Sequence, residues 1–395
     1  MTHKATSLFS QIITTIIDAR EFRSIVRAHH GDKHSKGLRC RDQLVAMLFL
    51  HLSKVTSLRE IGHGLRTVAG KIAHLGMMKV PGHSTLAYAN AHRPAEMYRE
   101  LFFAILARCQ SLLHGRKPFR FKNRLVSMDA TFIQLCLSLF PWAQYQQTKG
   151  AVKLHMLYDH DGYFPAFAHI TNGKGADAPV ARQILSRPDV LSEGSIVVFD
   201  RAYVDFALFA TLISRGVFFV TRLKEGMNWI VAEQRGVPKQ GGILRDDLIA
   251  FQGKKAALLG QHLLRLVEYE DPATGERYRY LTNHLTFGPT TIARIYKERW
   301  QIEVFFKTLK QHLKIKTFVG TSENALLIQI WTALITVLAL KLLKKLSTFG
   351  WSLSNLVTLV RLTLFSYRDL SAWLDHPFSE PPWEPDIQLD LALDG

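Results

Sequence analysis

Length, composition and charge already limit the class of protein. The chain has 395 residues, of which 47% are hydrophobic and 21% charged, a balance typical of folded proteins and unlike that of disordered or fibrous chains. Its three cysteines are too few and too widely spaced for a disulfide framework or a cysteine zinc site. The 50 Lys and Arg exceed the 33 Asp and Glu, and the resulting net charge of +17 favours a polyanionic partner.

The first third of the chain is predicted to be helical and carries most of this charge. Residues 1–128 hold 21 Lys and Arg against 7 Asp and Glu. Helices are expected at 7–28, at 41–50, after a capping box that begins at Ser57, at 84–90 with Ser84 as a cap, and at 94–107. Short helices in a basic setting favour a helix-turn-helix-like DNA module, followed by a basic linker at 116–124 that also contacts phosphate.

From residue 125 the pattern predicts an α/β region. Apolar strands alternate with helices in the order βββαβαβ, and Asp177 is expected to cap the first of these helices. A β-rich insertion with two strands follows, then a long helix, a buried apolar helix, a final helix and an acidic, proline-containing tail. The predicted ranges are, for the strands, 125–135, 153–158, 164–170, 195–200, 218–221, 264–269 and 278–283; for the helices, 178–185, 204–214, 291–314, 325–346 and 352–365; and for the tail, 369–395.

Three carboxylates stand where an isolated charge would be costly. Asp129 lies within a hydrophobic strand and Asp200 ends another, and an unpaired buried carboxylate costs several kcal/mol unless a cation or metal balances it. For either aspartate alone, a turn cap or a pair with an arginine such as Arg201 is the favoured interpretation, and a third carboxylate shifts the balance. On the long helix, Glu303 shares a polar stripe with Tyr296, Arg299 and Lys310; the simpler alternative is a solvated face with a Glu303–Lys307 pair, which does not account for the tyrosine.

Together these residues favour phosphodiester chemistry. Two carboxylates from strands and one from a helix, Asp129, Asp200 and Glu303, suit two divalent ions, and oxygen ligands without cysteine indicate Mg²⁺ or Mn²⁺ rather than zinc. Arginine, lysine and tyrosine side chains nearby would contact phosphates. The residues expected to do so are Tyr296, Arg299, Lys310, Arg201 and Lys307.

The spacing of the helix residues resembles a known signature. Tyr296, Arg299, Glu303 and Lys310 match Y-x2-R-x3-E-x6-K, which is found in DDE transposases of the insertion sequence four family, and the segments 127–131 and 199–203 are also similar to that family. The resemblance extends over roughly 5–375. It implies an RNase H-like (retroviral integrase) fold and DNA cleavage at transposon ends followed by strand transfer.

Some relatives of this family hold a flipped base with aromatic wedges. Trp229 and Trp300 are the candidates here, although a single tryptophan is more often part of a core.

The sequence therefore predicts an α/β protein with an RNase H-like catalytic core, a mixed sheet, a β-rich insertion and an all-α N-terminal DNA-binding region. The expected boundaries are 1–115 for the helical region, 116–222 plus 287–368 for the core, 223–286 for the insertion and 369–395 for the tail.

The expected activity is metal-dependent, cut-and-paste DNA transposition. Expected partners are double-stranded DNA (transposon terminal inverted repeats and target DNA) and a second copy in a homodimeric synaptic complex. Without a signal peptide, and with an apolar run at 325–340 that is shorter than the ~20 residues needed to cross a bilayer, we expect a cytoplasmic, nucleoid-associated protein with no membrane partner. Two alternatives remain: an RNase H-like DNA nuclease that does not join strands, and a non-catalytic repressor from a decayed element.

Overall fold

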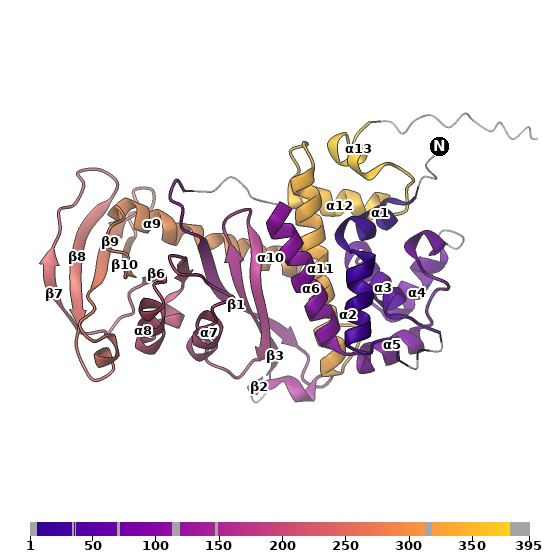
Figure 1. The fold of residues 1–395 in the computed structure, drawn as a ribbon, viewed down its shortest axis with the longest axis horizontal. Helices are drawn as coiled ribbons and strands as arrows, with labels where there is room; N and C mark the ends of the chain where they lie inside the picture. The colour runs from indigo at the N-terminus through magenta and orange to yellow at the C-terminus, as the bar shows by residue number, and fades with distance from the viewer. Residues whose placement is uncertain are drawn as a thin grey trace, which may run out of the picture.

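The computed structural model describes residues 6–33, 35, 37–68, 72–112, 119–146, 149–312 and 318–379. A large sheet lies at one end of the molecule and helices α1 to α5 lie at the other, with α6 and α11 between them (Figure 1). The predicted fold class is confirmed, since helices precede a mixed sheet that is covered by helices on both faces.

Six helices form the N-terminal region. Their bounds are α1 Leu8–Ile16, α2 Ala19–Ala28, α3 Cys40–Ser53, α4 Leu58–Arg66, α5 His83–His92 and α6 Ala95–Leu112. The single helix expected at 7–28 is two helices, because the Asp18 carboxylate accepts the backbone N–H groups of Arg20 and Glu21 and starts α2. Ser57 caps α4 as expected, whereas Ser84 does not cap α5, whose N-cap is Gly82.

The middle of the chain forms one ten-stranded sheet in the order β2-β3-β1-β5-β6-β10-β9-β8-β7, with β4 paired to β3. Strand β1 pairs antiparallel with β3 and parallel with β5. The strands are β1 Leu125–Leu135, β2 Gln144–Gln146, β3 Lys149–Asp159, β4 Phe164–Asn172, β5 Ile196–Phe199, β6 Phe218–Arg222, β7 Trp229–Gln234, β8 Ile243–Phe251, β9 Leu264–Glu270 and β10 Arg277–Thr282.

Alternating residues of the central strands build two hydrophobic layers. Val126 and Met128 face α7 (Asp177–Leu185) and α8 (Phe206–Ser214), while Leu125 faces α9 (Pro289–Glu298) on the other side. The βββαβαβ order is confirmed, with β2 as an added short strand. The N-cap of α7 is Ala176, so the expected cap at Asp177 is wrong; that carboxylate instead accepts a hydrogen bond from the Lys153 ammonium at 2.8 Å.

The insertion is β-rich as expected but has four strands rather than two. Through β10 it continues the central sheet, because β10 pairs with β6. Strand β8 was missed because it carries Asp246 and Asp247; the Asp246 carboxylate is buried in a two-bond ion pair with Arg265, at 2.7 Å for each bond. Strand β7 was missed because its side chains are mostly exposed and do not alternate.

Four helices complete the described chain: α10 Trp300–His312, α11 Glu323–Leu346, α12 Leu353–Thr363 and α13 Leu370–Asp375. The long helix expected at 291–314 is α9 and α10, separated at Arg299; residues 313 and 314 lie outside the described residues. Helix α13 occupies the start of the expected tail, with Asp369 as its N-cap, and residues 380–395 also lie outside the described part.

Helix α11 is the core helix that joins the two ends of the molecule. It is long and apolar enough to cross a membrane, but 89% of its most apolar window is buried inside the protein. It packs against α3, α5, α6 and α10, and one hydrophobic cluster runs through these helices and the β3–β4 side of the sheet. The domain boundaries predicted from the sequence therefore cross a shared core, and they remain predictions.

Short 3-10 helices lie at η1 Ile72–Leu75, η2 Pro141–Ala143, η3 Arg201–Tyr203 and η4 Ala256–Leu259.

Candidate active site

Strand register brings the two predicted aspartates side by side. Strands β1 and β5 run parallel, and Met128 lies opposite Phe199. The next residues, Asp129 and Asp200, therefore follow at the same edge of the sheet. Neighbouring strands lie about 4.8 Å apart. Asp129 is still within β1, whereas Asp200 has left β5 and caps η3, where it accepts the Arg201 N–H at 2.7 Å.

The surroundings of Asp129 disfavour its ionised form. Burial raises the pKa of Asp129 from an ordinary value of 3.8 to about 6; a hydrogen bond from the Ala130 N–H and the Arg299 guanidinium act in the opposite direction, and Glu303 and Asp200 raise it further. Because a second positive charge would favour the ionised form, this carboxylate is suited to a cation ligand.

Glu303 reaches the same place from the first turn of α10, which packs on β1. The Arg299 guanidinium lies between the two acids, with Nη1 3.4 Å from Asp129 Oδ2 and Nη2 2.5 Å from Glu303 Oε1. The break between α9 and α10 puts this arginine at the joint. Two of the three predicted carboxylates are thus held by one guanidinium.

The third carboxylate is held by the signature tyrosine. Tyr296 Oη donates to Asp200 Oδ1 at 3.4 Å, and the Arg299 guanidinium lies 5.6 Å from the centre of the tyrosine ring. Burial raises the pKa of Tyr296 to about 12, so the phenol stays protonated. Tyr296 is 8% exposed, and its ring packs 4.9 Å from that of Tyr280, so the four signature residues do not form one open stripe along a straight helix.

A small open cavity of about 440 Å³ adjoins the acids. It is lined by Asp129, Thr131, Glu303, Phe306, Lys307 and Lys310. Lys310, the signature lysine, and Lys307 therefore lie next to Asp129 and Glu303. Lys310 is half-buried and Lys307 is exposed.

The remaining predicted residues lie at different distances from this cavity. Arg201 is exposed directly after Asp200, and Trp300 opens α10 with 61% of its surface exposed. Trp229 begins β7, and the five strands between β1 and β7 put it roughly 29 Å from Asp129. The Arg245 guanidinium lies over the Trp229 ring, 5.3 Å from the ring centre. The structure therefore brings together Asp129, Asp200, Glu303, Tyr296 and Arg299, with Lys307 and Lys310 on the cavity; Arg201 and Trp300 are exposed next in sequence to site residues, and Trp229 lies apart.

Sequence reasoning missed a buried polar network behind the acids. Ser127 Oγ lies 2.7 Å from His160 Nε2, and His160 Nδ1 lies 3.7 Å from the carboxylate of Glu298, the residue before Arg299. Tyr163 Oη donates to the same carboxylate at 3.4 Å. Burial lowers the pKa of His160 to about 4, so this ring is neutral. Ser127 and His160 are fully buried and cannot reach a substrate. The hydrogen bond at the α9–α10 joint is the one from Tyr163 to Glu298, and the neutral His160 ring lies beside it. The one sequence signal was Ser127, two residues before Asp129 and on the same face of the strand.

As they stand, the described residues contain no group of three His, Cys, Asp or Glu side chains close enough to hold a metal ion. The donor chemistry nevertheless fits a hard divalent cation, since Asp129, Asp200 and Glu303 offer carboxylate oxygens and two of them already share a positive charge.

The class of protein follows from the family that the chain matches. Residues 120–339 match the family described as "Transposase DDE domain", and residues 4–78 match "Domain of unknown function (DUF4372)". The chain is 31% identical over 309 residues to "Putative transposase y4zB" of Sinorhizobium fredii (strain NBRC 101917 / NGR234), covering 77% of this chain and 82% of that protein. The chain belongs to the DDE transposases of insertion sequences.

A second curated relative is also named as a transposase. "Putative transposase for insertion sequence element IS4SA" of Synechocystis sp. (strain ATCC 27184 / PCC 6803 / Kazusa) is 56% identical over 268 residues, which cover 66% of this chain and 71% of that protein. Among solved structures, the "Cryo-EM structure of piggyBac transposase synaptic complex with hairpin DNA (SNHP)" matches with a TM-score of 0.44 and 12% identity, over 91% of this chain and 79% of that one.

Family membership establishes the general activity. The protein is an enzyme that binds and cleaves DNA and transfers strands, and its chemistry depends on divalent metal ions. The mixed α/β fold with N-terminal helices that the sequence predicted is the one observed.

Proposed function

We propose that Asp129, Asp200 and Glu303 are the catalytic, metal-binding residues of a cut-and-paste transposase. The observation that carries the proposal is the shared Arg299 guanidinium: Asp129 and Glu303, 174 positions apart by their numbers, meet at one cation, with Asp200 on the strand beside them. Asp129 in β1, Asp200 after β5 and Glu303 on α10 thus lie at one edge of the sheet.

The three carboxylates would hold two Mg²⁺ ions, with Mn²⁺ as a substitute. Two ions in such a site lower the pKa of an attacking water or 3′-hydroxyl and stabilise the leaving oxygen of an in-line displacement. The residues themselves orient the scissile phosphate. For this the Arg299 guanidinium must leave the acids, which frees its paired N–H groups for a phosphate.

Cations around the cavity suit the DNA backbone. Lys307 and Lys310 line it, and exposed Arg201 extends the positive surface beyond Asp200. Tyr296 would position Asp200 through its hydroxyl and, once Arg299 moves, present that hydroxyl to a phosphate.

Two tryptophans are proposed to stack on bases. Trp300 is 61% exposed beside Arg299, which suits a base unstacked near the scissile bond. Trp229, on β7 at the outer edge of the sheet, would contact DNA farther from the chemistry.

The substrates we propose are the terminal inverted repeats of the element and a target duplex. Two ends must be processed together, so we propose a homodimer in the synaptic complex, acting in the cytoplasm at the nucleoid. The helical region 1–115 would bind DNA, and 116–222 with 287–368 would carry the catalysis.

A supercoiled plasmid that carries the element's ends tests the proposal. Incubated with the protein and Mg²⁺, it should yield excised element, and Asp129→Ala, Asp200→Ala and Glu303→Ala should each abolish cleavage while leaving binding to the ends intact. Cleavage by any of these variants at the wild-type rate would contradict the assignment. Release of the element without insertion into a target would favour the nuclease alternative, and end binding without any cleavage would favour the repressor.

A further inference from the structure

The N-terminal helical region contains two adjoining cavities with a strongly cationic lining. One, of about 630 Å³, lies along α2 and is lined by Arg23, Arg27, Lys33, Arg39 and Arg41. The other, of about 750 Å³, lies between the 30s loop and α5 and includes Lys79, Tyr88 and His92. His30 and Lys33 line both, so the two form one groove, which we call the basic groove.

Most of the charge in the basic groove is not neutralised by the protein. Within the described residues, Arg23, Arg27, Lys33 and Lys79 form no ion pair, and all four are exposed. Two carboxylates also line the groove, and both have other partners. Asp32 Oδ1 accepts the Cys40 N–H at 2.7 Å and lies 3.5 Å from Arg93 Nη2, and Asp42 Oδ2 accepts the Arg39 N–H at 3.0 Å. Like charges gathered without counter-charges destabilise a surface unless an anion binds there.

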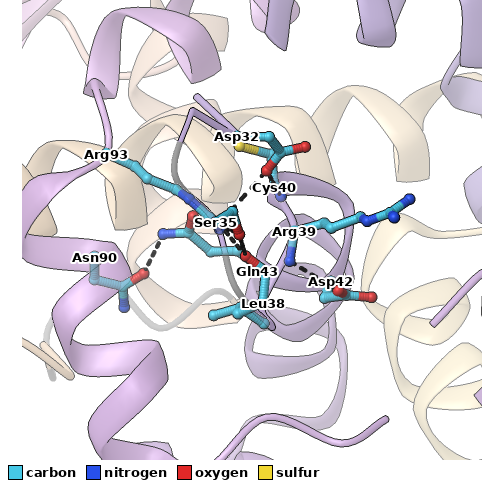
Figure 2. A network of polar contacts seen from close by, with 9 residues as sticks. All are labelled: Asp32, Ser35, Leu38, Arg39, Cys40, Asp42, Gln43, Asn90 and Arg93. Carbon is cyan, nitrogen blue, oxygen red and sulfur yellow. Dashed lines mark hydrogen bonds and ion pairs between the residues drawn. The ribbon is translucent and has the colours of Figure 1, made fainter. Parts of the chain in front are cut away.

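The walls of the groove are fixed by a buried hydrogen-bond network. Figure 2 shows the Arg93 guanidinium reaching from the end of α5 into the 30s loop, where it donates to the Leu38 carbonyl, to Ser35 Oγ at 3.3 Å and to Gln43 Oε1 at 3.0 Å. Gln43 in turn donates to Asn90 Oδ1 at 2.7 Å. The loop, α3 and α5 are thereby held together before any ligand arrives, so little ordering cost remains for binding.

This hydrogen-bond network is also joined to the core helix α11. The Asn324 side chain, at the start of α11, donates to the backbone carbonyls of Asn90 and Arg93 at 2.8 and 2.7 Å. The position of the groove is therefore fixed relative to the core helix that also packs against α10, the helix of the acidic site.

The groove differs from the helix-turn-helix arrangement that the sequence suggested. Helix α6 is packed against α2, α11 and β4, with Tyr98 and Phe102 fully buried. Its exposed charges are of both signs, Glu96, Arg99 and Glu100, and Glu100 contacts His29 at 2.6 Å, so α6 offers no cationic face to a DNA backbone. The cationic residues come instead from α2, the loop before α3, the start of α3 and the segment before α5.

An exposed aromatic pair lies at the rim of the groove. Tyr88 is 67% exposed, and its ring stacks on that of His92 at 4.0 Å between centroids, with 21° between the planes. The pair adds a flat surface beside cations, which suits the sugars and bases of nucleic acid better than a bare inorganic anion.

We propose that the basic groove binds the phosphate backbone of a DNA duplex, as a second DNA contact separate from the acidic site. The inference rests on the proposed function, in which DNA is the substrate, and it gives the region that matches the domain of unknown function a ligand and a set of residues. The cations are spread over two cavities and four segments, so they suit a row of phosphates and not one nucleotide.

The test is a binding measurement without catalysis. Fluorescence anisotropy of a short labelled duplex, copied from the element's end, is followed against salt concentration with the full chain in EDTA. Lys33→Glu/Lys79→Glu is expected to weaken binding at least tenfold and to lower the salt slope by about 2, since each lost phosphate contact removes about 0.9. A duplex of unrelated sequence should be affected equally, because backbone contacts carry no sequence information.

A matched control makes the same charge change at the other end of α11. Lys344 and Lys345 lie about 30 Å along that helix from the groove anchor at Asn324, and Lys344→Glu/Lys345→Glu should leave the affinity within twofold of wild type. Both double variants alter exposed residues, and circular dichroism should confirm their folding.

The outcomes separate the two proposals. If wild type binds the duplex and the groove variant binds as tightly as its control, the groove proposal is wrong while the proposed function stands. If the wild-type chain binds no duplex at all, the proposed function fails as well. Weakened binding in the groove variant alone, with cleavage still dependent on Asp129, supports both.

Discussion

The burial of Asp129 makes a quantitative prediction about stability. With its pKa raised from 3.8 to about 6, the ionised carboxylate destabilises the folded chain at neutral pH by about 3 kcal/mol, because each pKa unit is worth about 1.4 kcal/mol. Asp129→Asn removes the charge and keeps the size of the side chain. We expect this variant to lose all cleavage and yet to be up to about 3 kcal/mol more stable than wild type at pH 7.

The pH dependence follows from the direction of the shift. Between pH 3.8 and about 6 the unfolded chain has released the Asp129 proton while the folded chain retains it, so wild-type stability falls as pH rises through this window. Above it both states are ionised and the contribution stays constant. The advantage of Asp129→Asn should therefore be small near pH 4, grow up to about pH 6 and then level off.

Urea unfolding in EDTA, followed by circular dichroism from pH 4 to 8, measures this difference. Glu225→Gln, an exposed carboxylate in the loop before β7, serves as the control and should stay within about 0.5 kcal/mol of wild type at every pH. An Asp129→Asn chain no more stable than wild type at pH 7, or more stable by the same amount at every pH, would refute the reasoning.

Three further substitutions test the surroundings of the acids. Arg299→Gln removes the bridging guanidinium, so titration calorimetry of the DNA-free chain should show tighter Mn²⁺ binding together with lost cleavage; unchanged Mn²⁺ affinity would contradict the bridge. Glu298→Gln weakens the hold on the α9–α10 joint and should slow cleavage about tenfold without changing DNA affinity, and a wild-type rate would remove the positioning role. Trp300→Ala should leave the unfolding midpoint unchanged, because the ring is 61% exposed, but should lower cleavage of intact ends, whereas equal cleavage would exclude base stacking.

Strong periodicity in the sequence was enough to predict most of the fold. The central strand β1 was predicted with its observed bounds, because the run 125–135 is rich in apolar and β-branched residues despite Asp129. Strand β8 could not be predicted, because its two aspartates are acceptable in a sheet only through partners such as Arg265, 19 residues away. The division of the long helix at Arg299 was also invisible, since no proline or glycine marks it and the ion pairs of that arginine involve another part of the chain.

The candidate site was predictable as a set of residues but not as an arrangement. Charged residues in apolar strands pointed to Asp129 and Asp200, and the fixed spacing pointed to Glu303. The sequence could not indicate that Arg299 holds two of the acids, nor that Tyr296 is buried against Asp200, because both depend on the angle between α9 and α10. The position of Trp229 likewise required the strand order.

Anomalous diffraction from crystals of the protein with Mn²⁺ and DNA ends tests the central claim most directly. The account predicts two peaks about 3.5–4 Å apart, each within about 2.2 Å of carboxylate oxygens drawn from Asp129, Asp200 and Glu303, with the Arg299 guanidinium displaced onto a phosphate. Mn²⁺ bound beside the scissile phosphate by other residues, with Arg299 still joining Asp129 to Glu303, would contradict it.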